Sequence, residues 1–235
     1  MKKQCNGWGY FPMPNCVIVE ETLYYSTKRV FSTMLAYCGR HDTVRKSIEE
    51  LAVLSGCCEA TVQQALEQLE ALGYIRKIHR WRYSRFFSRP VFDKNAYEIN
   101  RKKLSGGFTL VPRELLRADV THSAFVVALY VYMKSGRAGR SWASLRHTAK
   151  QLDMSKATVC RALELLRRLQ ILARLRCRKA NRAFACNSFY PTAWVRPGKT
   201  GTQARKLFAV TGGLIFDKHK VINKITGVSI WRGRI

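Results

Sequence analysis

Acidic residues are scarce in this chain of 235 residues, in which 15 Asp and Glu face 42 Lys and Arg and the formal net charge is +27. The scarcity is greatest after Asn100: residues 1–100 hold 14 basic and 10 acidic side chains, whereas residues 101–235 hold 28 and 5. An excess of one sign repels itself unless a polyanion is bound, and nucleic acid is the commonest polyanion. The second half is therefore expected to supply most of the affinity for nucleic acid.

A long apolar run is also missing. No stretch approaches the roughly 18 to 20 apolar residues of a membrane-spanning helix, and residues 1–15 lack the apolar run of a signal peptide. We therefore expect no membrane partner and a cytoplasmic location.

Paired metal ligands are lacking as well. The five histidines are scattered, and the eight cysteines show no Cys-x-x-Cys pairs of the kind that hold zinc. We expect reduced thiols, no metal, no cofactor and no catalytic residues, so the chain is not expected to be an enzyme. The adjacent Cys57 and Cys58 are expected to be small buried residues at a helix start, with a vicinal disulfide or redox sensor as the alternative.

An internal repeat is present. Residues 47–77 align without a gap on residues 144–174 at an offset of 97, and Ala60-Thr61-Val62 falls on Ala157-Thr158-Val159. The apolar residues that follow also match, since Ala65, Leu66, Leu69 and Leu72 fall on Ala162, Leu163, Leu166 and Leu169. A period near 100 residues is too long for a solenoid, so it indicates two copies of one small domain.

Each copy predicts two helices joined by a short turn. In the second, residues 144–152 form a short helix, and Ser155 is placed to cap an amphipathic helix through Leu169. In the first, Ser47 and Glu50 are spaced as a capping box, and the second helix covers residues 59–72. Scaffold helices are expected at residues 26–37 and 123–133, and residues 107–116 and 15–23 are each expected to start as a strand. The two helices joined by a short turn in each copy predict a helix-turn-helix.

A basic hairpin is expected after each helix pair. In the second copy, residues 171–178 alternate in polarity, residues 179–181 form a turn and residues 183–190 return. In the first, residues 75–80 lead into a turn at 81–85 and a return at 86–92. The predicted fold is therefore mainly α with small β-hairpin wings (α+β), built as two tandem winged-helix domains. Their limits are residues 1–99 and 108–195, with a linker at 100–107 and a basic C-terminal extension at 196–235.

The chain resembles the tandem winged-helix proteins of bacterial plasmids and conjugative elements, which include helix-turn-helix regulators and two-winged-helix replication initiators. The resemblance covers residues 17–194 and rests on FTLVPRELL, THSAFVVALYVYM and SKATVCRALELLRRLQIL. It implies binding of double-stranded DNA without selecting the biological consequence.

The DNA-contacting residues are expected on the second helix of each pair and on the wings. Side chains near the start of such a helix meet base edges in the major groove, and an arginine such as Arg161 can pair with guanine, contact phosphate or pair with Glu164. Gln64 could address adenine, or the first helix could contact protein instead. Trp81 and Tyr83 leave stacking on single strands as an alternative for the first wing. The predicted helix residues are Lys156, Thr158, Cys160, Arg161, Thr61, Gln63 and Gln64. The predicted wing residues are Arg174, Arg176, Arg178, Lys179, Arg182, Arg80, Arg82 and Arg85.

These observations predict a sequence-specific double-stranded DNA-binding protein, with regulation of a bacterial mobile element as the first interpretation. A plasmid-type replication initiator and a non-specific architectural DNA- or RNA-binding protein are the alternatives. Residues 196–235 are expected to form a hairpin or a helix that packs on the second domain or on a second copy of the chain in a homodimer.

Overall fold

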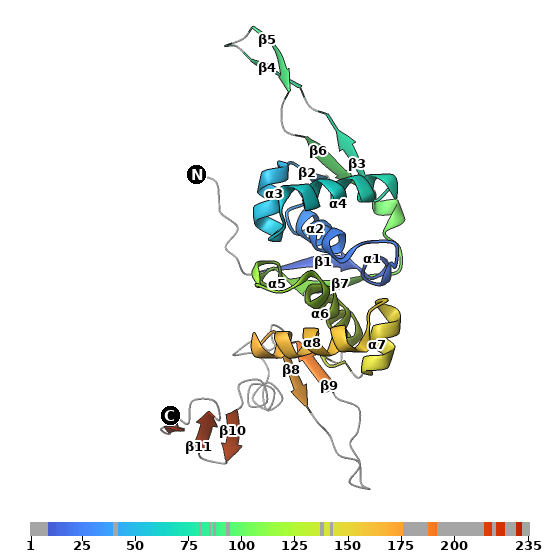
Figure 1. The fold of residues 1–235 in the computed structure, drawn as a ribbon. Coiled ribbons are helices and arrows are strands. Elements are labelled where there is room, and N and C mark those ends of the chain that lie inside the picture. Colours follow the sequence, from blue (N-terminus) through green and yellow to red (C-terminus); the bar gives the residue numbers. More distant parts are fainter. Residues whose placement is uncertain are drawn as a thin grey trace. The chain divides into compact units, whose positions relative to one another are not determined.

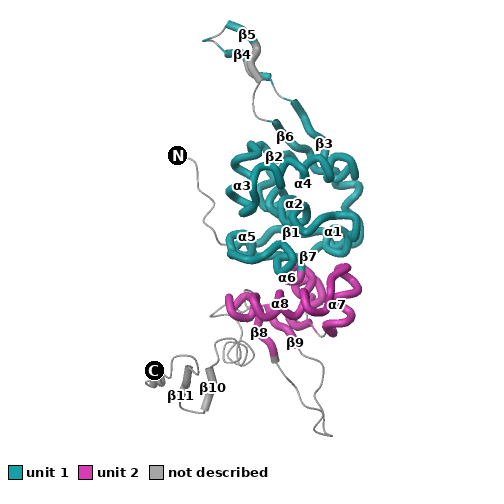
Figure 2. Tube along the Cα trace, viewed as in Figure 1, with its two compact units in different colours: residues 1–126 teal, residues 127–235 magenta. Residues whose placement is uncertain are grey.

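The computed structural model describes residues 9–39, 42–79, 81–84, 86, 88–92, 95–136, 139–141, 143–175, 188–191, 214–217, 220–223 and 229–231. Helices are combined with small antiparallel sheets, as expected (Figure 1). The chain divides into unit 1, residues 1–126, and unit 2, residues 127–235 (Figure 2). The division falls within helix α6 (His122–Ser135).

Unit 1 contains most of the secondary structure. Its helices are α1 (Asn15–Val19), α2 (Tyr25–Ala36), α3 (Ile48–Ser55), α4 (Glu59–Ala71), α5 (Glu114–Arg117), the start of α6, and the 3-10 turn η1 (Arg101–Lys103). Its strands are β1 (Tyr10–Pro14), β2 (Thr43–Val44), β3 (Ile75–Ile78), β4 (Trp81–Ser84), β5 (Arg89–Phe92), β6 (Ala96–Ile99) and β7 (Phe108–Pro112).

Helix α2 forms the centre of unit 1, where it packs against α3 and α4. Its buried apolar residues Val30, Phe31 and Met34 belong to the same core as Leu51 and Leu69. The predicted capping box of α3 is confirmed: the Ser47 side chain accepts from the Glu50 amide at 3.1 Å, and the Glu50 carboxylate accepts from the Ser47 amide at 2.9 Å. Local signals therefore determine where α3 begins.

Two cations are buried in α2. The Lys28 ammonium group donates to the Ile18 carbonyl at 2.9 Å, and only 2% of Lys28 is exposed. Burial lowers the pKa of Lys28 to about 8, against the opposing attraction of Glu20 and Glu21. Arg29 is also buried and donates to backbone carbonyls. These two side chains distinguish α2 from an ordinary apolar core helix.

The strand predicted within residues 15–23 is wrong. Residues 15–19 form α1, and the strand lies just before it as β1, which pairs antiparallel with β7. The Val and Ile residues of α1 favour a strand by propensity, but Val17 and Ile18 are buried on a short helix instead. The sequence did not predict strand β1 because Pro12 and Pro14 argue against a central strand. Both strands of a two-stranded sheet are edge strands, in which proline is tolerated.

The turn predicted at residues 81–85 is also wrong. Residues 81–84 form β4, which pairs with β5 as a separate two-stranded sheet. The strand that returns to β3 is β6, and the second sheet has the order β2-β6-β3. Because β6 has only four residues and follows a polar stretch, its burial of Ala96, Tyr97 and Ile99 was not expected from the sequence.

The predicted linker, residues 100–107, lies within unit 1. It begins with η1, where the Arg101 guanidinium pairs with Asp42 at 2.6 Å and the Lys103 ammonium donates to the Leu72 carbonyl. The Asn100 side chain donates to the Gly73 carbonyl at 3.0 Å. These contacts attach the start of the segment to the end of α4 and to the loop before β2.

Unit 2 continues from α6 through α7 (Leu145–Gln151), α8 (Lys156–Arg168), β8 (Leu172–Leu175) and β9 (Ser188–Pro191). Helices α7 and α8 pack together, and β8 pairs antiparallel with β9. Val159, Leu166, Leu172 and Phe189 are buried. In the basic extension, β10 (Leu214–Asp217), β11 (Lys220–Asn223) and β12 (Ser229–Trp231) form a three-stranded antiparallel sheet.

Candidate nucleic-acid interface

Helix α8 begins at a well-formed cap. The Ser155 hydroxyl oxygen accepts from the Thr158 amide at 3.0 Å, and the Ser155 and Thr158 hydroxyl groups are 2.9 Å apart. The predicted N-cap is confirmed, and it fixes the start of the helix because one free amide of the first turn gains an acceptor. Thr158 is half-buried, and its hydroxyl group takes part in this cap.

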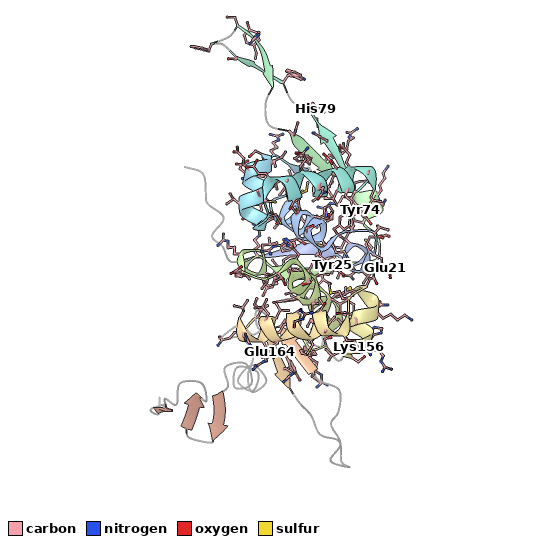
Figure 3. The ribbon with its side chains drawn as sticks, in the orientation of Figure 1. Glu21, Tyr25, Tyr74, His79, Lys156 and Glu164 are labelled. Carbon is pink, nitrogen blue, oxygen red and sulfur yellow. The ribbon has the colours of Figure 1, made fainter. Side chains whose placement is uncertain are left out.

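Basic side chains cover the solvent face of α8. Three of the predicted residues, Lys156, Cys160 and Arg161, are exposed, and Arg167 and Arg168 extend the basic face toward the end of the helix. Figure 3 labels Lys156 and Glu164 on α8. The opposite face buries Val159, Ala162, Leu163 and Leu166. The helix therefore presents four basic residues and one acidic residue, Glu164, on a 13-residue scaffold.

Glu164 pairs with Arg167 and not with Arg161. The Arg167 guanidinium donates to Glu164 at 2.6 Å, and Arg168 lies 3.9 Å from the same carboxylate. Hydrogen bonding from Arg167 lowers the pKa of Glu164, with smaller contributions from the charges of Arg168 and Arg174. The Arg161 Nε donates to the Ala157 carbonyl at 3.4 Å, and within the described residues Arg161 forms no ion pair.

Helix α4 places its predicted residues in a different electrostatic setting. Gln63 and Gln64 are exposed, and Gln63 donates to Glu67 at 3.2 Å. Thr61 is half-buried, and its hydroxyl group lies 3.0 Å from the thiol of Cys58. This hydrogen bond, followed by backbone amides at the helix start, lowers the pKa of the exposed Cys58 thiol. The exposed surface of α4 carries acidic residues and no Lys or Arg.

The structure covers only part of each predicted wing. Arg174 is half-buried on β8, opposite Phe189 of β9. For Arg82 only the backbone, within β4, is described. Six predicted wing residues lie outside the described part of the chain: Arg176, Arg178, Lys179, Arg182, Arg80 and Arg85.

Other exposed residues add to these candidates. On the hairpin of β4 and β5, Trp81 and Tyr83 are 68% and 63% exposed, and Phe86 between the two strands is 89% exposed. In unit 2, Arg146 and Lys150 are exposed one turn apart on α7. Sequence reasoning did not select Phe86, Arg146 or Lys150, although the i,i+4 spacing of two basic residues on a predicted helix was available as a signal.

The described residues contain no group of three or more His, Cys, Asp and Glu side chains that could hold a metal ion. Cys16, Cys38, Cys57, Cys58 and Cys160 are free thiols. None of the described helices is both long enough and apolar enough to cross a membrane. No protein-family model matches the chain, and no curated protein sequence matches it significantly.

Proposed function

We propose that this chain is a sequence-specific double-stranded DNA-binding protein made of two winged-helix copies, in which α8 is the main recognition helix. The observation that carries the proposal is the basic, capped face of α8, with Lys156 and Arg161 exposed near its start. An α-helix fits the major groove, and its first turns are the part that meets base edges.

The spacing of the elements supports two copies of one domain. Helices α2, α3 and α4 and strand β3 begin at residues 25, 48, 59 and 75, and α6, α7, α8 and β8 begin at 122, 145, 156 and 172. Every pair is separated by 97 residues, the offset of the sequence repeat. The return strands fit the same plan with a shorter second wing, because Ile75 pairs with Ile99 and Leu172 with Pro191.

The charge distribution supports nucleic acid as the partner of the second copy. Arg161 has no carboxylate partner among the described residues, so its guanidinium fork is available to a guanine edge or a phosphate. The excess of basic residues after Asn100 adds a sequence-independent attraction to the phosphate backbone. Regulation of a mobile element is the proposed biological role.

Selection from random duplex DNA at near-physiological salt tests this function, with single-stranded DNA and RNA as competitors. We expect an enriched duplex motif. Arg161→Ala should relax preference at one base pair by about 1–3 kcal/mol. Arg76→Ala, which removes an exposed charge from β3, is the matched control and should leave the motif unchanged. Absence of an enriched motif, or preferential capture by RNA, would contradict the proposal.

The exposed aromatic residues of the first hairpin favour a second candidate, a replication initiator that also contacts unpaired bases. Stacking of a base on an aromatic ring contributes about 1–3 kcal/mol and depends little on sequence. Trp81→Ala with Tyr83→Ala should then weaken binding to a duplex with an unpaired bubble more than binding to the intact duplex. Equal weakening of both would count against this role.

A further inference from the structure

A pocket of about 700 Å³ lies in unit 1, between the end of α3 and the loop that leads from α5 into α6. Its volume falls within the range of small-molecule sites. The apolar part of its wall includes Val53, Leu54, Leu116 and Val120, and the polar part includes Arg29 and His122. The DNA-binding proposal uses none of these residues.

Arg29 places a buried positive charge at this pocket. Only 5% of Arg29 is exposed, and its Nη1 and Nη2 donate to the carbonyls of Val120 at 2.6 Å and Ala118 at 3.2 Å. Its Nε is buried without a hydrogen-bond acceptor in the described part of the chain. The carbonyl groups satisfy two donors but do not neutralise the charge, and a buried cation without a counterion is costly.

The start of α6 adds further donors. Thr121 caps this helix, since its hydroxyl oxygen accepts from the Ala124 amide at 3.3 Å, so the positive end of the helix dipole lies at the pocket wall. The Nδ1 of His122 is buried and has no partner among the described residues. Burial, followed by the charge of Arg29, lowers the pKa of His122, so its imidazole is neutral at pH 7 and donates in one tautomer.

The remaining charged residues at the wall are Arg117 and Asp119, both exposed. Cys57 and Asp119 both interact electrostatically with Arg29, and none of the ion pairs between described residues joins Arg29 to Asp119. Gly56 leaves room for the guanidinium: its φ is +65°, and a Cβ there would lie 3.2 Å from the Arg29 Nη2. The charges that face Arg29 therefore leave the pocket net positive.

We propose that this pocket binds a small organic carboxylate, with the carboxylate beside Arg29 and His122 and an apolar body against Leu54, Leu116 and Val120. The anion supplies the negative charge that the carbonyl groups around Arg29 do not provide. The apolar wall selects a carboxylate that carries an aliphatic or aromatic group over a bare inorganic anion. This inference does not depend on DNA binding.

Calorimetric titration of the full chain with benzoate tests the site. Benzyl alcohol is the neutral analogue of the same shape, and inorganic phosphate is the anion without an apolar body. We expect one benzoate per chain, with benzyl alcohol and phosphate each at least ~10-fold weaker, because a charge-assisted hydrogen bond is stronger than a neutral one. Absence of saturable benzoate binding, or equal binding of benzyl alcohol, would overturn the proposal.

A matched pair of variants locates the binding without disturbing the core, because Val53 lines the pocket and is 83% exposed. Val53→Asp adds a negative charge at the wall and should weaken benzoate binding by ~5-fold or more. Val53→Asn has nearly the same shape without the charge and should stay within about 2-fold of the original chain. If both variants bind benzoate equally well, benzoate binds elsewhere and the proposed site is wrong.

Discussion

Helices α4 and α8 have the same length and the same spacing of buried residues, but their exposed faces have opposite charge. Both helices have 13 residues. Helix α4 buries Val62, Ala65, Leu66 and Leu69, and α8 buries Val159, Ala162, Leu163 and Leu166. On the solvent side α4 carries three Glu and no basic residue, whereas α8 carries four basic residues and one Glu. Packing sets one face of each helix, and the other is free to determine the partner.

Helices α2 and α6, which precede α4 and α8, differ in the charge of their buried residues, and here the basic side chains are in unit 1. Helix α2 buries Lys28 and Arg29, whereas the positions 97 residues later in α6 are Phe125 and Val126, which are also buried. The core of unit 1 therefore contains two cations where the sequence of α6 has apolar side chains. Unit 1 therefore combines two cations buried in α2 with an acidic α4, and unit 2 has a basic α8.

The largest expected effect concerns Lys28. Its pKa is lowered to about 8 in the folded chain, below the value of an unfolded lysine near 10.4. Between pH 8 and 10 the unfolded chain therefore binds more protons, and the free energy of unfolding rises with pH. A shift of this size corresponds to about 3 kcal/mol. Urea unfolding at a series of pH values measures it.

Lys28→Met is the control for this pH dependence. Burial also raises the pKa values of the Cys16 and Cys38 thiols, but these groups contribute equally to both proteins. The difference between the original chain and Lys28→Met should therefore change by about 2 kcal/mol from pH 8 to 10. Parallel curves would show that the Lys28 ammonium group is not desolvated.

The second effect is on DNA affinity. Lys156→Glu with Arg161→Glu should lower the affinity of the chain for duplex DNA by ~100-fold at low salt, because two phosphate or base contacts become repulsive. The slope of log affinity against log salt concentration should become less steep by about two, because about two fewer counterions are released on binding. Titrations of fluorescent duplex DNA at several salt concentrations provide both values.

The matched exchange in α4 uses the positions 97 residues earlier, Glu59 and Gln64. Glu59→Lys with Gln64→Arg gives the start of α4 the charges of α8 and should raise DNA affinity by ~10-fold, with a steeper salt dependence. Unchanged affinity in this variant would show that α4 does not approach DNA and would leave α8 as the recognition helix of the pair.

Six helices, α2, α3, α4, α6, α7 and α8, could be predicted within about two residues because their signals are local, whereas α1 was expected as a strand. Ser47 and Ser155 mark helix starts through bonds to residues three positions away, and the apolar spacing of α4 and α8 predicts their buried faces. The exposed positions of Lys156 and Arg161 follow from the same periodicity.

The missed features depend on contacts between distant residues. Strand β1 exists because Tyr10 pairs with Pro112, and β6 returns to β3 after the interposed hairpin of β4 and β5. The pocket at Arg29 was not foreseen for the same reason, since its guanidinium donates to the carbonyl of Val120, 91 residues away. A buried arginine cannot be distinguished from an exposed one by its place in an amphipathic pattern alone.

The smallest expected effect compares the caps of the two helices. Ser155 caps α8 with its side chain, whereas the equivalent residue of α4, Cys58, makes no side-chain cap to the backbone. Ser155→Ala should lower the free energy of unfolding by about 1 kcal/mol, and Cys58→Ser should raise it by up to about 1 kcal/mol, because a hydroxyl oxygen accepts the Thr61 amide better than sulfur does. Hydrogen exchange of the α4 and α8 amides measures each change in its own helix. Unchanged or reduced protection in α4 on Cys58→Ser would contradict this prediction, because it would show that the contact between the Cys58 thiol and the Thr61 hydroxyl, at 3.0 Å, already stabilises that helix start at least as well as a serine cap does.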